Sequence, residues 1–281
     1  MAKLRDEAVT AADLQRFVES KADFAFEMRV LRRFEELGYT CEHGGTYRDP
    51  ITDKIRQFDI RAHRRYGSTV HLAIAAECKN IGKNFPLLVH AVPRKAAEAF
   101  HTLVVSDGQH PSPRARPVRG DLSRYRPGVV VGKRLDQVGR AAAGGDVVSS
   151  DQEVFEKVSQ SVNSTVDLLH AIAASGVRPA LHAIVPLLVV PDGRLWLVEY
   201  SSAGEQKGVP RPVDACTVFL DQEWSCTTLH HDQLTYRLSH FEITALGALK
   251  NTLRVLWEPT DYTSGLFLPT ARELSIEFNW P

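Results

Sequence analysis

The spacing of apolar residues predicts a helix near the start of the chain. Residues 22–37, ADFAFEMRVLRRFEEL, repeat apolar positions at helical intervals and end at Gly38, a residue suited to a left-handed C-cap. The apolar residues on one arc are Phe24, Val30, Leu31 and Phe34. Glu27 falls in the middle of that arc, so the pattern directs a carboxylate toward the protein interior.

Two strands are predicted after this helix. Residues 55–63, IRQFDIRAH, alternate apolar and polar positions, which is typical of a half-buried strand, and Asp59 lies within them. Residues 70–80, VHLAIAAECKN, are apolar almost throughout, which indicates cover on both faces. The short turn between the two predicts an antiparallel hairpin.

The next 70 residues mix short predicted elements with long connections. In chain order we expect a short helix over 93–100, a strand over 101–106, a surface loop or lid over 107–128 and a Gly- and Ala-rich linker over 139–150. A long helix over 151–175 follows, capped by Ser150 or Asp151.

The last third predicts further strands and a terminal helix. Strands over 180–190 and 194–201 flank the turn at 191–193 and are expected to pair as a second hairpin. Strands over 213–221 and 238–243 and a helix over 243–257 complete the pattern. The fold class is therefore α/β (α+β), with a core in residues 1–140 and an α+β half in 150–281. This half is either an extension of the first sheet or an accessory or dimerisation domain.

Composition narrows the classes of protein. The chain has 281 residues, 43% of them hydrophobic, and a formal net charge of zero. Residues 107–140 hold eight Lys and Arg against three Asp, whereas residues 221–281 hold four against eight acidic residues. We find no apolar run long enough to span a membrane, no signal peptide and no CxxC pair among four scattered cysteines. These features predict a cytoplasmic protein.

The candidate chemistry lies on the first predicted hairpin. Asp59 is on one strand, and Glu77 and Lys79 stand two residues apart on its partner, so their side chains leave the same face. Carboxylates and an ammonium close together are tolerated where they jointly hold a divalent metal and a phosphate. Mg²⁺ prefers oxygen ligands, and a neighbouring lysine can orient a water or neutralise phosphate charge. The group suits hydrolysis of a phosphodiester.

These residues resemble the PD-(D/E)XK nuclease superfamily, which has the restriction-endonuclease-like fold, a mixed sheet flanked by helices. The resemblance covers about residues 22–106, with the order helix, strand, strand, helix, strand. It implies that Asp59 and Glu77 bind Mg²⁺ or Mn²⁺, that Lys79 assists the attacking water and that Glu27 is a further ligand. Phe58 stands where the proline of the motif would be.

The resemblance also implies a substrate and a setting. It favours an endonuclease-type hydrolase acting on DNA rather than RNA, in bacterial defence, restriction or repair. It is compatible with a homodimer or an activating protein partner, and with Gln160 as an accessory residue on the long helix. Candidate phosphate-backbone contacts lie in the basic stretches: Arg64, Arg65, Lys83, Arg114 and Arg116.

Each assignment has a structural alternative. Glu77 and Lys79 could form salt bridges at a strand end, Glu27 could pair with a nearby arginine, Gln160 could be an ordinary polar helix position, and the basic residues could be a solvated surface. For the whole chain, the alternative is a non-catalytic nucleic-acid-binding or scaffold subunit that retains the nuclease fold.

Overall fold

The structure is a computed structural model that describes residues 6–20, 23–66, 70–106, 112–119, 125–141, 145–149, 152–174 and 180–257. The four α-helices of these residues are α1 (Ala11–Ser20), α2 (Phe24–Glu36), α3 (Gln152–Ala173) and α4 (Leu249–Trp257). The strands are β1 (Thr40–His43), β2 (Thr46–Arg48), β3 (Ile55–Gln57), β4 (Ile60–Tyr66), β5 (Val70–Cys78), β6 (Leu87–Pro93), β7 (Phe100–Ser106), β8 (Arg114–Arg119), β9 (Val130–Arg140), β10 (Val147–Ser149), β11 (Ala180–Val190), β12 (Leu195–Tyr200), β13 (Gln206–Pro212), β14 (Ala215–Thr227) and β15 (Gln233–Ala245).

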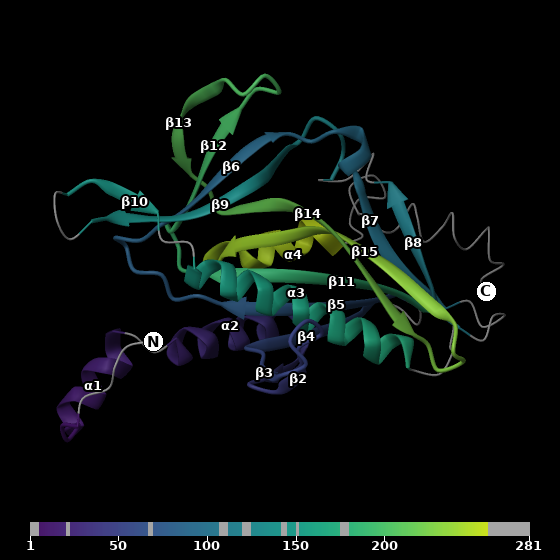
Figure 1. The fold of residues 1–281 in the computed structure, drawn as a ribbon, viewed down its shortest axis with the longest axis horizontal. Helices are drawn as coiled ribbons and strands as arrows, with labels where there is room; N and C mark the ends of the chain where they lie inside the picture. The colour runs from purple at the N-terminus through teal and green to yellow at the C-terminus, as the bar shows by residue number, and fades with distance from the viewer. Residues whose placement is uncertain are drawn as a thin grey trace.

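A mixed sheet with helices on both faces dominates the described part of the chain (Figure 1). Thirteen of its strands form one sheet, with the central order β1-β4-β5-β11-β15-β14-β9-β6-β12-β13, while β2 and β3 pair separately. The strands β1, β4 and β5 form antiparallel pairs, and β5, β11 and β15 run parallel. The α/β class expected from the sequence is therefore confirmed.

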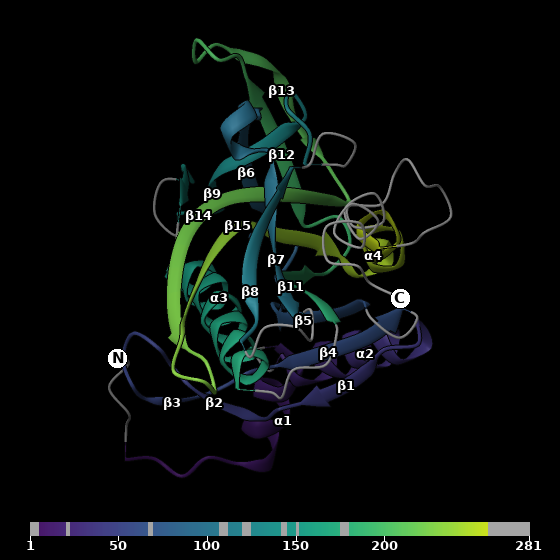
Figure 2. The same cartoon turned by 90° about the vertical axis from the view of Figure 1, so that its right-hand side faces the viewer.

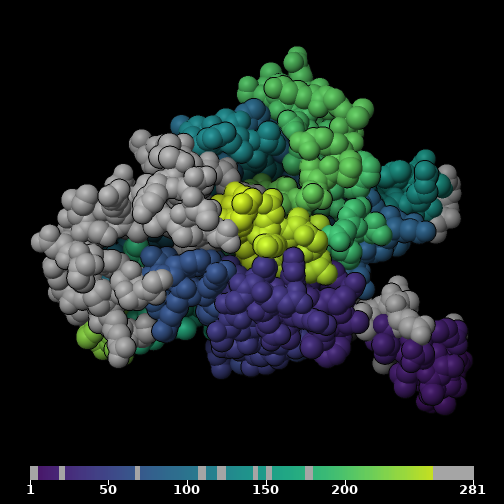
Figure 3. All heavy atoms as spheres, turned by 180° about the vertical axis from the view of Figure 1, so that it is seen from behind, coloured from purple at the N-terminus to yellow at the C-terminus, as the bar shows by residue number. Residues whose placement is uncertain are grey.

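Two apolar layers cover the centre of the sheet. On one face, α2 and α4 pack against alternate residues of β4 and β5, and on the other face α3 packs against β5 and β11. Figure 2 shows α3 and α4 on opposite sides of the sheet, and Figure 3 shows α4 (yellow) lying against the purple N-terminal segment. Alternation along β5 sends Cys78 into the α2 layer and turns the preceding residue, Glu77, toward α3.

The first helix and the first hairpin form as expected. Helix α2 buries Phe26, Val30 and Phe34 and ends at Glu36. Leu37 is its C-cap, and Gly38 follows at φ +81°, a backbone conformation that favours glycine. Strands β4 and β5 pair antiparallel, and β5 is buried over most of its length. Both elements, which were predicted from local periodicity, are confirmed. The predicted buried arc is wrong at Phe24, which is 61% exposed, whereas Phe26 is buried.

The predicted strand over 55–63 is wrong, because the chain bends inside it. Strand β3 pairs with β2 in the small separate sheet, and β4 begins only at Ile60. Asp59 lies in the bend, where its carbonyl accepts a hydrogen bond from Gly44 N (3.0 Å) and Phe58 N donates to Gly45 O (3.0 Å). A Cβ at position 45 would come within 2.4 Å of the Phe58 ring, so this close packing requires glycine.

Three predictions between 93 and 150 also fail. Residues 93–100 form only a 3₁₀ turn at Ala96–Glu98, and the strand β6 before it was not predicted. Residues 114–119 of the expected loop form β8, which pairs with β7, and the expected linker over 139–150 includes the paired ends of β9 and β10. In each case a tertiary partner for the backbone hydrogen bonds overrides weak local signals. The two candidate caps at 150 and 151 lie outside the described residues.

The second predicted hairpin does not form, although both of its strands exist. Strand β11 pairs with β5, β15 and β7, whereas β12 pairs with β6 and β13. The turn at 191–193 therefore carries the chain from the centre of the sheet to its far part. The terminal helix α4 begins at Leu249 rather than 243, because β15 continues to Ala245 and a 3₁₀ turn intervenes.

The order helix, strand, strand, helix, strand predicted over residues 22–106 is wrong, because β6 follows β5 and the expected second helix is only a 3₁₀ turn. Helix α3 packs on β5, and strand β11 pairs with β5, but both come after β6 to β10 in the chain. Strands from 1–140 and 150–281 alternate within one sheet, so the second segment extends the sheet of the first. No helix of the described residues is long and apolar enough to cross a membrane.

Candidate active site

Asp59 and Glu77 meet where the first hairpin reaches the edge of the α3 layer. Antiparallel pairing places Ile60 opposite Ala76, which brings the residue before β4 beside the end of β5. Cys78 N donates to Asp59 Oδ2 (2.8 Å), and Asp59 N donates to Glu77 Oε1 (3.3 Å). Backbone hydrogen bonds therefore hold both carboxylates, and the predicted convergence of this pair is present.

A lysine that the sequence analysis missed completes the group. Lys157 Nζ, from the second turn of α3, donates to Asp59 Oδ2 (2.7 Å) and to Glu77 Oε2 (2.9 Å). Its side chain is 19% exposed, and that of Glu77 only 1%. Lys157 lies three residues after buried Val154 and four before buried Ser161, on the buried side of the helix. A charged residue at a buried helical position is the sequence feature that could have identified it.

The electrostatics of the pair follow from burial. Burial and the neighbouring charge of Asp59 raise the pKa of Glu77 to about 8, although Lys157 opposes the rise. Burial alone would lower the pKa of Lys157, but the charges of Glu77 and Asp59 outweigh burial and raise the pKa above its ordinary value. The ammonium of Lys157 is thus held in its charged form between Asp59 and Glu77, and Glu77 retains its proton to a higher pH than an ordinary glutamate.

Lys79 lies beside this group, one residue past β5. Its backbone N–H donates to Val189 O (3.0 Å), and its side chain is half-buried. Burial raises the pKa of nearby Asp23, while the charge of Lys79 and the N–H of Asn80, 3.3 Å from Asp23 Oδ1, oppose the rise. The Lys79 cation therefore acts on Asp23 and lines the same cavity as Lys157.

Glu27 is near the group, and its contact is with a histidine. Glu27 Oε2 lies 3.2 Å from His43 Nε2, so the partner is not the arginine considered as an alternative. Burial and the charge of Asp59 raise the pKa of Glu27, and His43 opposes the rise. Among the described residues, no group of three His, Cys, Asp or Glu side chains is arranged to hold a metal ion. Glu27 is thus not brought into one ligand set with Asp59 and Glu77.

A cavity of about 730 Å³ opens beside Lys157, where β5 ends, α3 begins and the hairpin of β9 and β10 projects (left in Figure 1). Polar and charged side chains line much of it: Asp23, Lys79, Asn80, Gln137, Arg140, Glu156, Lys157 and Gln160. Gln160 is therefore placed one turn from Lys157 at the candidate site. Its carbonyl also accepts a hydrogen bond from the Tyr47 hydroxyl (3.3 Å).

Most of the predicted backbone-contact residues lie away from this cavity. Arg64 pairs with Leu72 in the hairpin, donates to Leu37 O (3.0 Å) and lies over the rings of Tyr39 and Tyr66, and Arg65 is its neighbour. Arg114 and Arg116 lie on β8, which pairs with β7. Strand β7 in turn pairs with the first residues of β11, at the opposite end of that strand from Lys79. Lys83 is exposed in the loop between cavity residues Gly82 and Phe85.

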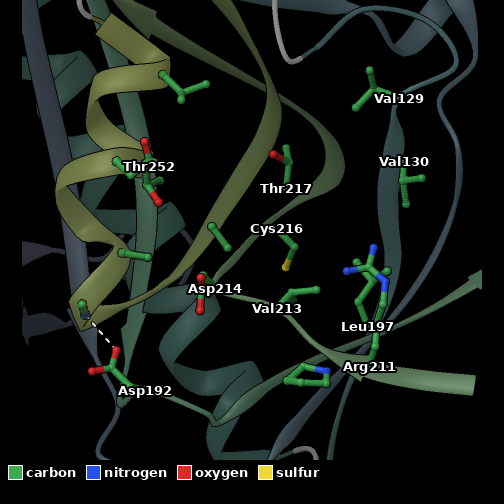
Figure 4. A pocket seen from close by; sticks show the side chains of 16 residues that line it. Val129, Val130, Asp192, Leu197, Arg211, Val213, Asp214, Cys216, Thr217 and Thr252 are labelled. Carbon is green, nitrogen blue, oxygen red and sulfur yellow. Dashed lines mark hydrogen bonds between the residues drawn. The ribbon is translucent and has the colours of Figure 1, made fainter.

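A second cavity, of about 950 Å³, lies between α4 and strands β12 to β14 (Figure 4). Three charged side chains line it: Asp192 accepts a hydrogen bond from Gly247 N (2.8 Å), Arg211 pairs with Glu199 (2.9 Å), and Asp214 is the third. Thr217 donates to buried Glu242. None of the residues predicted from the sequence lines this cavity, and we place the candidate chemistry at the first one.

Comparison with known proteins returned no match of the chain to any family model, to any curated protein or to any solved structure. The geometry of the site is therefore the basis for proposing a function.

Proposed function

We propose that this protein is a metal-dependent nuclease that hydrolyses phosphodiester bonds, with DNA as its substrate. One observation carries the proposal: Asp59 Oδ2 and Glu77 Oε2 lie 2.7 and 2.9 Å from a single cationic atom, Lys157 Nζ. Two buried carboxylates that converge on one cation are suited to share a divalent ion.

The arrangement of elements around the pair supports this reading. The PD-(D/E)XK resemblance implies a helix, a hairpin that carries the two carboxylates, a second helix and a further strand. Helix α2, the hairpin of β4 and β5, helix α3 and the parallel strand β11 could fill these places, with α3 and β11 instead of residues 93–106. The second helix packs on the sheet directly over the carboxylates and contributes Lys157.

The donor set fits Mg²⁺ or Mn²⁺, since carboxylate oxygens are the ligands that these hard cations prefer. Asp59 and Glu77 would hold the ion. Glu27 lies near them, since the charge of Asp59 raises the pKa of Glu27. When bound, such an ion polarises a phosphate oxygen and acidifies a water.

The protein's own residues supply the remaining chemistry. Cys78 N–H fixes the orientation of Asp59, and burial keeps water from competing for Glu77. Lys79 and Lys157 would neutralise the charge that grows on the phosphate oxygens as the water oxygen bonds to phosphorus and the ester oxygen departs with a proton. Preorganised cations of this kind stabilise the transition state more than the ground state.

The test compares cleavage of supercoiled plasmid, linear duplex and single-stranded DNA in Mg²⁺, Mn²⁺ or EDTA. We expect Asp59→Asn, Glu77→Gln and Lys79→Ala to lower the rate by roughly 100-fold or more. Glu199→Gln is the matched control, because Glu199 also follows a run of apolar residues, within β12, but pairs with Arg211 away from the cavity. Cleavage that survives EDTA and these substitutions would refute the assignment.

A second candidate is a nucleic-acid-binding subunit without catalysis. The observation that favours it is that Lys157 forms ion pairs with both Asp59 and Glu77, so a cation of the protein itself compensates their charge. This function predicts no cleavage under any condition and nucleic-acid binding that is equal in Mg²⁺ and EDTA.

A further inference from the structure

We propose that the cavity beside Lys157 binds an unpaired nucleotide of a single nucleic-acid strand, with its base stacked on Phe85. The inference rests on the proposed function and names the form of the substrate. It combines an exposed aromatic ring, a set of cationic side chains and the size of the cavity.

Phe85 has the features of a stacking platform. It lines the cavity, and its side chain is 51% exposed. Its position is held by the backbone, because Phe85 N donates to Gly82 O (3.0 Å) and Gln137 Nε2 donates to Phe85 O (3.3 Å). The ring is thus presented at a defined place without being buried.

The ring packs against a strand position that has no side chain. A Cβ added at Gly139 of β9 would come within 2.8 Å of Phe85 Cδ1 and 3.0 Å of Cε1, closer than such atoms approach one another. Gly139 does not have the positive φ that favours glycine, so what requires glycine there is the space taken by the ring. Strand β9 supports the ring from one side, and its exposed part is free to meet a base.

Cationic groups stand around the same cavity. Lys79, Lys157 and Arg140 line it together with the amides of Asn80, Gln137 and Gln160, while Asp23 and Glu156 are its two carboxylic acids. Aromatic stacking combined with neighbouring cations is the arrangement by which proteins bind single strands, because the ring holds the base and the cations hold the phosphates.

The cavity size favours an unpaired nucleotide over a duplex. About 730 Å³ is within the range of sites for small molecules, roughly 300 to 1,000 Å³. A base in a duplex has both faces covered by its neighbours and cannot stack on a side chain unless it leaves the helix. The nucleotide next to the carboxylates is therefore one from a single strand, a frayed end or a flap.

The experiment measures binding by the full chain in EDTA, where cleavage is absent. The ligands are a fluorescein-labelled 12-nucleotide single strand, the same sequence as a duplex, and deoxyadenosine monophosphate as competitor. Phe85→Ala should weaken single-strand binding by roughly 10-fold, and Phe85→Tyr should retain it. Gly139→Val should weaken it as well, because the added side chain displaces the ring.

Phe155→Ala is the matched control. Phe155 is 71% exposed on the first turn of α3 but does not line the cavity, so its loss should leave binding unchanged. Thermal unfolding of each variant verifies that it is folded. The competitor separates recognition of a nucleotide alone from recognition of a strand.

Three results with the variants would overturn the inference: wild-type affinity in Phe85→Ala, an equal loss in Phe155→Ala, or duplex binding that depends equally on Phe85. An equal loss in Phe155→Ala would instead indicate an apolar contact surface, and duplex binding that depends equally on Phe85 would indicate duplex recognition. Absence of single-strand binding by the wild-type chain would also overturn it. Cleavage by Glu77→Gln tests the proposed function separately. If Glu77→Gln loses cleavage while Phe85→Ala binds single strands normally, the proposed function stands and only the stacking on Phe85 is refuted.

Discussion

At the scale of single residues, the candidate site depends on alternation along β5. Cys78 is fully buried in the α2 layer, while Glu77 is turned to α3 and meets Lys157. A shift by one residue would exchange their places, because successive strand residues point to opposite faces. The apolar body of β5 thus determines where one carboxylate stands.

The raised pKa of Glu77, about 8 against an ordinary 4.5, predicts a pH dependence of stability. The folded protein retains this proton over a range in which the unfolded chain has lost it, so the stabilising contribution is complete below about pH 4.5 and is lost as pH rises to about 8. In EDTA, the free energy of unfolding of the wild type should fall as the pH rises through this window. In Glu77→Gln the fall should be smaller by a few kcal/mol, since one pKa unit corresponds to about 1.4 kcal/mol. Urea unfolding at pH 5, 6, 7 and 8 measures it, and parallel curves for the two proteins would contradict it.

Removal of Lys157 should destabilise the protein when no metal is present. Lys157→Ala leaves two carboxylates facing each other without a cation, which costs about 3 to 5 kcal/mol for a buried pair. Under the proposed function, Mg²⁺ should restore part of this loss and should raise the thermal unfolding temperature of the variant more than that of the wild type.

The control for this comparison is Lys207→Ala, because Lys207 is exposed on β13. It should unfold like the wild type in both buffers. An equal effect of Mg²⁺ on all three proteins would show that the ion does not bind where Lys157 lies.

At the scale of elements, helix α3 is the part that assembles the site. Its buried Ser161 hydroxyl donates to Ala75 O of β5 (2.8 Å) and accepts from Leu187 N of β11 (3.1 Å). Arg61 of β4 donates to Asp167 of α3 (2.8 Å). Polar contacts to β4, β5 and β11 therefore fix the position of α3 on the sheet, and with it the position of Lys157.

Ser161→Ala should loosen this attachment. The substitution leaves buried backbone groups without their hydrogen-bond partner, so we expect a loss of about 1 to 3 kcal/mol in the free energy of unfolding. Cleavage should also slow, because Lys157 lies one turn before Ser161. Ser159→Ala on the half-buried part of the same helix is the control, and denaturant unfolding gives the comparison. Equal stability of the two variants would argue against the attachment.

At the scale of the whole molecule, the two segments form one sheet. Strand β5 pairs with β11 over nine residues, and β11 pairs with β15. A fragment that ends at residue 149 would lack α3 and β11, exposing the long apolar edge of β5.

We therefore expect the fragment 1–149 to show no cooperative thermal unfolding by circular dichroism and to aggregate. Deletion of residues 1–20 is the matched truncation, because the residues of α1 whose side chains are described are exposed and the helix projects away from the sheet (Figures 1 and 3). It should change the free energy of unfolding by no more than about 0.5 kcal/mol. A cooperative transition in 1–149 would show that this segment folds alone.

The sequence by itself determined the local parts of this protein. Helical spacing and Gly38 predicted α2, and continuous apolarity predicted β5 and its hairpin with β4. Because these features depend on neighbouring residues, they also placed Asp59 beside Glu77 correctly, despite the bend that separates β3 from β4.

Only the tertiary structure decided which distant segments meet. Lys157 lies 98 residues from Asp59 and 80 from Glu77, and β11 pairs with β5 rather than with β12, its neighbour along the chain. Apolar strands resemble one another in sequence, so local pattern cannot select their partners. The choice is made by burial of both faces of the sheet and by satisfaction of buried polar groups such as Ser161, which depend on the whole chain at once.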